Sequence, residues 1–131
     1  MIQAIAPMLV VADVARSAAF YEQVIGLKLE GSFTPEGRTT ASWANMRRGA
    51  VELMLSCPTE TPAGPVSRAQ LYIRVDDVLP VLARAKAAGI ATRGPYVRFY
   101  QCKEIEMSDP DGFQLIVSAD TDEPPSEDQG E

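Results

Sequence analysis

The chain has 131 residues, a formal net charge of −6, 46% hydrophobic residues and two cysteines. That length suits one ordinary domain, which can bury a sufficient core without disulfides or a metal. No apolar stretch approaches the roughly 20 residues of a membrane-spanning helix, so we expect no membrane partner. Six of the 18 acidic residues and none of the 12 Lys and Arg fall in residues 120–131. The remainder is therefore formally neutral, and it lacks the basic stripe that nucleic acid binding requires.

The ends of the chain and its cysteines indicate a location. Met1 to Val11 lack a basic leader followed by an apolar stretch and a cleavage site, which predicts no signal peptide. Cys57 and Cys102 fit free thiols in a reducing compartment better than a disulfide. We therefore expect a cytoplasmic protein. Residues 119–131 are acidic and contain Pro, Ser and Gly, a composition that predicts a disordered tail.

The first half of the chain predicts a strand, a helix and three further strands. Ile5–Val11, an apolar run rich in β-branched residues, predicts the first strand. A helical pattern follows, with apolar residues three and four apart, and Gly26 ends it. The remaining strands are predicted at Leu27–Phe33, Thr39–Met46 and Val51–Ser56. This order of elements is a βαβββ module.

The same order returns after a linker rich in Pro, Gly and Thr, Pro58–Pro65. Ala69–Val75 predicts a strand, Asp77 is a suitable N-cap for a helix, and Gly89 ends that helix. Further strands are predicted near Ile90–Tyr96, at Gln101–Met107 and at Phe113–Ser118. The second half therefore predicts a second βαβββ module.

A constant offset relates the two halves, since Asp13 and Asp77, which precede the two helices, are 64 residues apart. Such repetition predicts a fold built twice from one unit, a thin sheet with a helix on a single face. The fold class is therefore α+β, with two tandem βαβββ modules that form a cupped, partly open eight-stranded sheet. The domain is expected to span residues 1–118, with modules at about 1–57 and 66–118.

Three landmarks in the expected order connect the chain to a known family. They are the opening segment Leu9–Asp13 with Phe20–Tyr21 and Gly26–Leu27, the start of the second module at Ile73–Asp77, and the turn Ser108–Gly112. Together they resemble the vicinal oxygen chelate superfamily, which includes glyoxalase I, extradiol dioxygenases and the bleomycin-resistance proteins. The resemblance covers about residues 4–118 and is closest to the metal-free bleomycin-resistance type. It implies a ligand-binding cup and a homodimer.

The resemblance also implies positions for a divalent metal on the first and last strands of each module. These positions fall on Ala6, Glu52, Gln70 and Ile116. A metal ligand must offer a lone pair from oxygen, nitrogen or sulfur, so Glu52 and Gln70 are capable and the other two are not. The chain also contains no histidine. We therefore expect no metal and no other cofactor.

Two residues offer other chemistry. Glu52 could act as a general base, or it could hydrogen-bond Gln70 or an arginine as a structural residue. Cys102 precedes Lys103, a cation that favours a thiolate, but no histidine is present to act as its base. Cys102 is therefore interpreted as a packing residue, and no catalytic residue is assigned.

The aromatic residues predict a ligand surface. Alternation within Thr39–Met46 places Trp43 on the same face as Ala41 and Asn45, a half-open surface on which flat ligands could stack. Packing in the core or against a second subunit is the competing interpretation of this indole. The candidate ligand-binding residues are Trp43, Phe33, Glu52, Met54, Gln70, Tyr72, Phe99 and Tyr100.

These features favour non-catalytic binding and sequestration of a small organic molecule with a planar aromatic ring system, such as a peptide antibiotic, in the manner of drug resistance. The alternative is a metal-dependent lyase, isomerase or dioxygenase of the same superfamily with atypical ligands. That alternative predicts an activity abolished by a chelator. A third interpretation is a structural or regulatory homodimer whose cup is filled by its own side chains.

Overall fold

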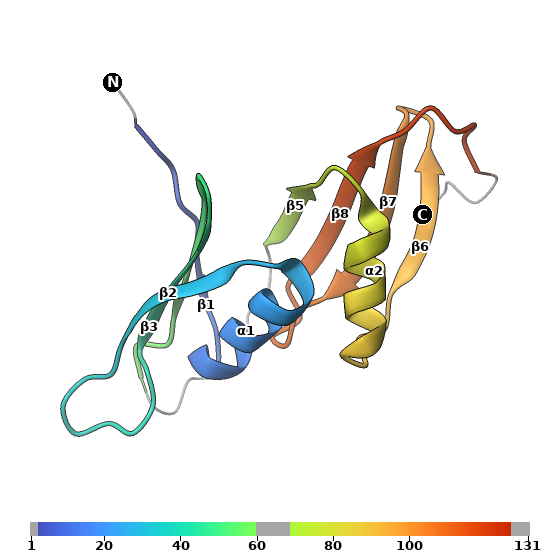
Figure 1. Ribbon diagram of the computed structural model, residues 1–131. Coiled ribbons are helices and arrows are strands. Elements are labelled where there is room, and N and C mark those ends of the chain that lie inside the picture. Colours follow the sequence, from blue (N-terminus) through green and yellow to red (C-terminus); the bar gives the residue numbers. More distant parts are fainter. Residues whose placement is uncertain (1–2, 60–68, 127–131) are drawn as a thin grey trace. The chain divides into compact units, whose positions relative to one another are not determined.

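The computed structural model describes residues 3–59 and 69–126. It divides the chain into two compact units, Met1–Val66 and Ser67–Glu131. In each unit one four-stranded sheet carries its helix on one face (Figure 1). Within the described residues, no helix is long and apolar enough to cross a membrane.

The first unit is one βαβββ module. Its elements are β1 (Met8–Val10), α1 (Val14–Phe20), the π-helical segment η1 (Tyr21–Ile25), β2 (Lys28–Phe33), β3 (Trp43–Arg48) and β4 (Val51–Ser56). The strands lie in the order β1-β4-β3-β2, with β1 parallel to β4 and the other pairs antiparallel. Asp13 begins α1 by accepting a hydrogen bond from the Arg16 amide at 3.1 Å. Gly26 ends η1 in the left-handed conformation, at φ 95°.

The second unit repeats this topology. Its elements are β5 (Gln70–Arg74), α2 (Val78–Ala87), β6 (Arg93–Arg98), β7 (Cys102–Ser108) and β8 (Gln114–Asp120). The strand order β5-β8-β7-β6 again pairs the first and last strands in parallel. Asp77 caps α2, as predicted, by accepting from the Leu79 amide at 3.0 Å. The repeated order confirms the α+β class and the tandem modules, and neither sheet is closed.

Alternate residues of each strand face the helix and form the core of each unit. In the first unit, Leu53 and Leu55 of β4 are buried, and Phe20 and Tyr21 meet edge to face with ring centroids 5.1 Å apart. The corresponding core residues of the second unit are Ile105, Met107, Leu115 and Val117. The opposite face of each sheet, termed the open face below, carries the side chains that lie between these positions.

Three strands begin three or four residues later than predicted, each for a local reason. The first strand begins at Met8 because Pro7 has no N–H with which to extend the ladder. The third begins at Trp43 because the chain before it bends around the Arg38 guanidinium, which donates to the carbonyls of Cys57 and Ala41. Strand β6 begins at Arg93, since the Ile90 amide still bonds the Ala85 carbonyl at the end of α2.

The C-terminal segment differs from the disordered tail expected after residue 118. Strand β8 continues to Asp120, and residues 121–126 lie along the second unit. Gln101 Nε2 donates to the carbonyls of Thr121 and Glu123, at 3.0 and 3.1 Å. The Ser126 amide donates to the Val97 carbonyl at 2.9 Å. Residues 127–131 of the expected tail, and residues 60–65 of the expected linker, lie outside the described residues.

Candidate ligand-binding site

The open face of the first unit presents an aromatic pair at one end of β3. Trp43 is half-buried and lies opposite Phe33 of β2 on one side and Ser56 of β4 on the other. Phe33 is 58% exposed. Asn45 shares this face whereas Ala44 between them is fully buried, as the alternation predicted. The two rings therefore form an accessible aromatic surface.

Polar partners hold Glu52 on the same face. Glu52 lies directly opposite Arg47 in the β3–β4 register, and the Arg47 Nη2 atom is 3.1 Å from its Oε1 atom. The Asn45 side-chain amide donates to the other carboxylate oxygen. Arg47 also pairs with Glu30 at 2.9 Å. Glu52 thus has the arginine partner that a structural role predicts, and Met54 lies next to it on the open face, half-buried.

The open face of the second unit is built around a buried carboxylate, Glu104 of β7. Its side chain is 2% exposed and accepts hydrogen bonds from Tyr72 at 2.5 Å and from Tyr100 at 2.9 Å. Ser118 of β8 donates to it at 3.0 Å, and Arg98 of β6 donates at 3.3 Å. A carboxylate can only accept, so each of these four groups directs a proton toward it.

These contacts set the pKa values of the cluster. Burial acts to raise the pKa of Glu104, but the hydrogen bonds from Tyr72, Tyr100, Ser118 and Arg98 outweigh it, so that the pKa lies below the ordinary range. The pKa of Tyr100 is raised, first by burial of its hydroxyl and then by its hydrogen bond to Glu104. Near neutral pH, Glu104 is therefore an anion and Tyr100 a neutral donor.

A second carboxylate, Glu106, lies two residues along β7 on the same face. Arg98 Nη2 is 3.0 Å from its Oε2 atom, and Arg93 pairs with its Oε1 atom. The Arg98 guanidinium also lies over the Tyr96 ring, 4.8 Å from its centroid. Two guanidinium groups therefore balance the carboxylates of Glu104 and Glu106, and the cluster is formally neutral.

A pocket of about 240 Å³ opens onto this cluster. It is lined by Tyr72, Arg98, Phe99, Tyr100, Glu104, Glu106 and Ile116. Phe99 is 79% exposed, and its ring meets the Tyr100 ring edge to face at 5.1 Å. Both rings belong to the β6–β7 turn, which Gln101 holds by its bonds to Thr121 and Glu123. The pocket therefore combines exposed aromatic rings with an ordered polar floor.

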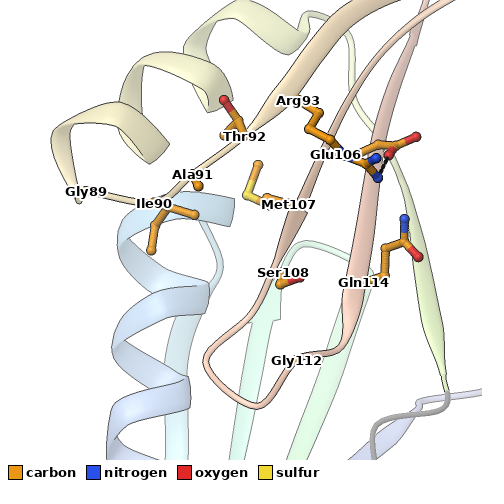
Figure 2. A pocket seen from close by; sticks show the side chains of 10 residues that line it. All are labelled: Gly89, Ile90, Ala91, Thr92, Arg93, Glu106, Met107, Ser108, Gly112 and Gln114. Carbon is orange, nitrogen blue, oxygen red and sulfur yellow. Dashed lines mark hydrogen bonds and ion pairs between the residues drawn. The ribbon is translucent and has the colours of Figure 1, made fainter. Parts of the chain in front are cut away.

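Figure 2 shows a second and larger depression in this unit, of about 650 Å³. It extends from the segment Gly89–Arg93 after α2 to β7 and the start of β8. The Arg93–Glu106 pair lies at one end of it, with Gln114 beside the pair (Figure 2). Glu106 lines both pockets. Among the described residues, no aromatic side chain lines the larger pocket, whereas Tyr72, Phe99 and Tyr100 line the smaller.

The positions that the family resemblance assigns to a metal do not fit one. In the first unit Ala6 offers no donor atom, and Glu52 already binds Asn45 and Arg47. In the second unit Ile116 is apolar, and Gln70 Nε2 donates to Gln114 Oε1 at 2.9 Å. Across residues 3–59 and 69–126, no three His, Cys, Asp or Glu side chains gather as metal ligands do.

The candidate residues thus fall into two groups, one in each unit. Phe33, Trp43, Glu52 and Met54 share the open face of the first sheet. Tyr72, Phe99 and Tyr100 line the pocket of the second, whereas Gln70 lies two residues before Tyr72 on the exposed edge strand β5. Sequence reasoning missed the polar floor, which consists of Arg93, Arg98, Glu104, Glu106 and Ser118.

One signal could have found this floor. Within β7 the sequence alternates Glu104, Ile105, Glu106, Met107, which places two carboxylates on the face opposite the core. A pair of charges on a mostly buried strand requires partners, and a search for arginines on the adjacent strand would have reached Arg98.

The chain resembles known proteins over almost its whole length. The sequence pattern of the Glyoxalase/Bleomycin resistance protein/Dioxygenase superfamily matches residues 2–117. TioX from Micromonospora sp. ML1 has a similar solved structure, with a TM-score of 0.74 and 20% identity over 90% of this chain and 98% of its own. No curated protein sequence matches the chain.

Two further solved structures share this fold. A bleomycin-binding protein complexed with bleomycin matches with a TM-score of 0.68 and 22% identity, over 91% of this chain and 99% of its own. A bleomycin resistance determinant encoded on the transposon Tn5 matches with a TM-score of 0.69 and 21% identity, over 91% and 98%. At these identities the likeness concerns the fold.

Proposed function

Because the chain belongs to the glyoxalase/bleomycin resistance protein/dioxygenase superfamily, we propose that it binds and sequesters a small organic molecule with a planar ring system, without catalysing a reaction on it. The observation that carries the proposal is the make-up of the open faces. Exposed rings lie beside ionisable groups that already neutralise one another. Such a surface supplies affinity through ring stacking and burial.

The state of the carboxylates supports binding over catalysis. A general base needs a lone pair within reach of the proton that it removes. Each oxygen of Glu52 already has a partner, Asn45 or Arg47, and Glu104 accepts from four donors within its own unit. The chain has no histidine to serve in their place. We therefore assign no catalytic residue.

The ligand is expected to be an antibiotic-type molecule, since two of the similar structures are those of a bleomycin-binding protein and a bleomycin resistance determinant. Sequestration requires affinity and sufficient protein, and no turnover. As part of the same proposal, the chain acts as a homodimer in the cytoplasm, where the buried free thiols Cys57 and Cys102 would stay reduced.

Trp43 is the only tryptophan of the chain, so its fluorescence reports on this surface directly. We expect the emission to change on titration with bleomycin or with a peptide antibiotic that bears a planar chromophore. Trp43→Ala is expected to weaken binding about tenfold, measured by equilibrium dialysis, because a stacked ring is lost. The affinity of Trp43→Phe should lie between those of the wild type and Trp43→Ala. Leu79 is an exposed apolar residue on α2, so Leu79→Ala serves as the control and should bind like the wild type.

Two results would count against the proposal. If the wild type and Trp43→Ala bound the ligand with equal affinity, the Trp43 indole would not be part of the binding surface. Turnover of a superfamily substrate that a chelator abolishes would instead support the metal-dependent alternative.

A further inference from the structure

We infer that the 240 Å³ pocket of the second unit takes planar ligands whose edge carries an N–H donor, and that it discriminates against planar carboxylates. The inference rests on the proposed function and names the ligand class for this part of the open face. It depends on the hydroxyls of Tyr72 and Tyr100, which Glu104 fixes as hydrogen-bond acceptors toward the pocket.

Glu104 holds the hydroxyl protons of both phenols. Tyr72 donates to Glu104 Oε2 and Tyr100 donates to Glu104 Oε1. Ser118, 3.1 Å from the Tyr72 hydroxyl, donates to the same carboxylate. Each tyrosine has one hydroxyl proton, and Glu104 can only accept, so both protons are committed to the interior of the cluster.

The oxygens of the two phenols can still accept hydrogen bonds from a ligand in the pocket. A phenol oxygen that donates its proton keeps its acceptor lone pairs. Tyr72 and Tyr100 are 50% and 47% exposed, and both line the pocket. A ligand in the pocket therefore meets two hydrogen-bond acceptors whose orientation is already fixed, and an amide or amine N–H is the matching group.

The charged groups of the polar floor already pair with one another. Arg98 pairs with Glu104 and Glu106, and Arg93 pairs with Glu106, so both guanidinium groups of the floor already have carboxylate partners. An incoming carboxylate would face phenol lone pairs and the Glu104 anion. It would lose hydration without gaining a phenol proton in return, which is unfavourable in a partly buried site.

The pocket also has aromatic and apolar walls. The exposed Phe99 ring and the Tyr100 ring meet edge to face above the polar floor, and Ile116 adds an apolar wall. A flat ring can contact these surfaces while its substituent reaches the phenol oxygens. The pocket thus pairs recognition of a ring with recognition of its N–H group.

Three neutral or anionic probes of one ring size test the inference. They are 2-naphthamide, methyl 2-naphthoate, which lacks the N–H, and sodium 2-naphthoate, which is an anion. In ligand-detected NMR titrations of the full chain, we expect 2-naphthamide to bind about threefold to tenfold more tightly than either of the others, the effect of one or two hydrogen bonds.

Variants then assign the preference to the phenols. Tyr72→Phe and Tyr100→Phe keep the rings and remove the acceptors, so each should reduce the preference for the amide over the ester toward one. Tyr96→Phe removes a hydroxyl on β6 outside the pocket lining and should leave the preference unchanged. The ranking of the three probes by the wild type stands as a test even where a variant folds poorly.

The outcomes separate this inference from the proposed function. Equal binding of all three probes, or tighter binding of the carboxylate, would overturn the N–H preference while leaving planar-ligand binding intact. Failure of all three probes on a chain that still binds bleomycin in the Trp43 titration would overturn the assignment of this pocket alone. Failure in both assays would overturn the proposed function as well.

Discussion

Glu104 occupies an unusual environment for a glutamate, since its charged group is almost fully buried in β7. Removing an ion from water is costly, and the charge is tolerated because four donors surround it. Three of those donors come from other strands, on β5, β6 and β8. The carboxylate therefore joins all four strands of the second sheet and positions the two phenols of the proposed pocket.

This arrangement predicts a large effect of a small change. Glu104→Gln replaces an acceptor oxygen with a donor amide that faces donors, so we expect a loss of about 2 to 4 kcal/mol in the free energy of unfolding. Urea denaturation at pH 7 measures it. Glu22→Gln, at an exposed position on η1, is the matched control and should change stability by less than about 0.5 kcal/mol.

The same pair of variants predicts a pH dependence. The pKa of Glu104 is lower in the folded chain than the value of about 4.3 expected for an unfolded glutamate. Its contribution to stability is therefore fully present above that value and is lost as the pH falls through the folded-state pKa. The difference in free energy of unfolding between the wild type and Glu104→Gln should therefore become smaller as the pH falls from 7 to 3. A difference that stays constant over this range would contradict the stabilising role of the Glu104 anion.

At the scale of elements, Gly94 decides how β6 lies against β7. Its φ is +96°, and a Cβ at this position would lie 2.7 Å from the Glu104 carbonyl oxygen. The β6–β7 register shifts between Arg93 and Tyr96, around this residue. The glycine therefore permits the irregularity that brings Arg93 onto Glu106 and Tyr96 opposite Glu104.

We predict that Gly94→Ala lowers the free energy of unfolding by about 1 to 3 kcal/mol, because of the positive φ and the backbone contact. Gly31→Ala in β2 is the control, since Gly31 also lies at a register shift but has no positive φ, and a methyl group added there would meet no atom within 4 Å. If urea denaturation gave the two variants the same free energy of unfolding, the backbone at residue 94 would have adjusted to the methyl group without loss of stability.

The segment 121–126 also acts as an element of the second unit. Lys103 pairs with Glu123 at 3.1 Å, in addition to the hydrogen bonds that Gln101 donates and the one that the Ser126 amide donates to the Val97 carbonyl. A chain that ends at Asp120 loses these contacts, whereas a chain that ends at Ser126 keeps them. We expect the first to melt a few degrees lower, which corresponds to about 1 kcal/mol. If the two shortened chains had the same melting temperature, residues 121–126 would not contribute to stability, as the sequence had predicted for the tail.

The elements themselves were largely predictable because their signals are local. Asp77 and Gly26 mark helix ends by side-chain capping and backbone conformation, which adjacent residues determine. The prediction began the first strand at Ile5 instead of Met8, although Pro7 in the sequence indicates that a strand begins after it. The ordered conformation of segment 121–126 was not predictable, since it depends on contacts with Gln101 and Lys103, which are 20 residues away in the chain.

The candidate site was predictable only in part, for a related reason. Alternation placed Trp43 correctly on the open face, since period two is a property of one strand. The partners of Glu104 come from three other strands, at sequence separations of 32, 14 and 6 residues, and from the β6–β7 turn, four residues away. Pairing of this kind depends on register, which a single sequence does not display.

For the molecule as a whole, the two units repeat one topology and carry different open faces. The first offers Trp43 and Phe33, and the second offers a neutral polar floor beneath Phe99 and Tyr100. The net charge of −6 includes the six acids of residues 120–131, so the remaining residues have no net charge with which to attract an ionic ligand. This distribution agrees with a ligand recognised by its rings and hydrogen bonds.

Native mass spectrometry of the full chain at neutral pH, alone and with bleomycin and other chromophore-bearing peptide antibiotics, tests whether the chain binds a planar ligand without a metal. We expect the mass of a homodimer without a divalent ion, and a complex with a planar antibiotic that survives treatment with a chelator. A tightly held divalent ion, whose removal by the chelator also abolishes ligand binding, would contradict it.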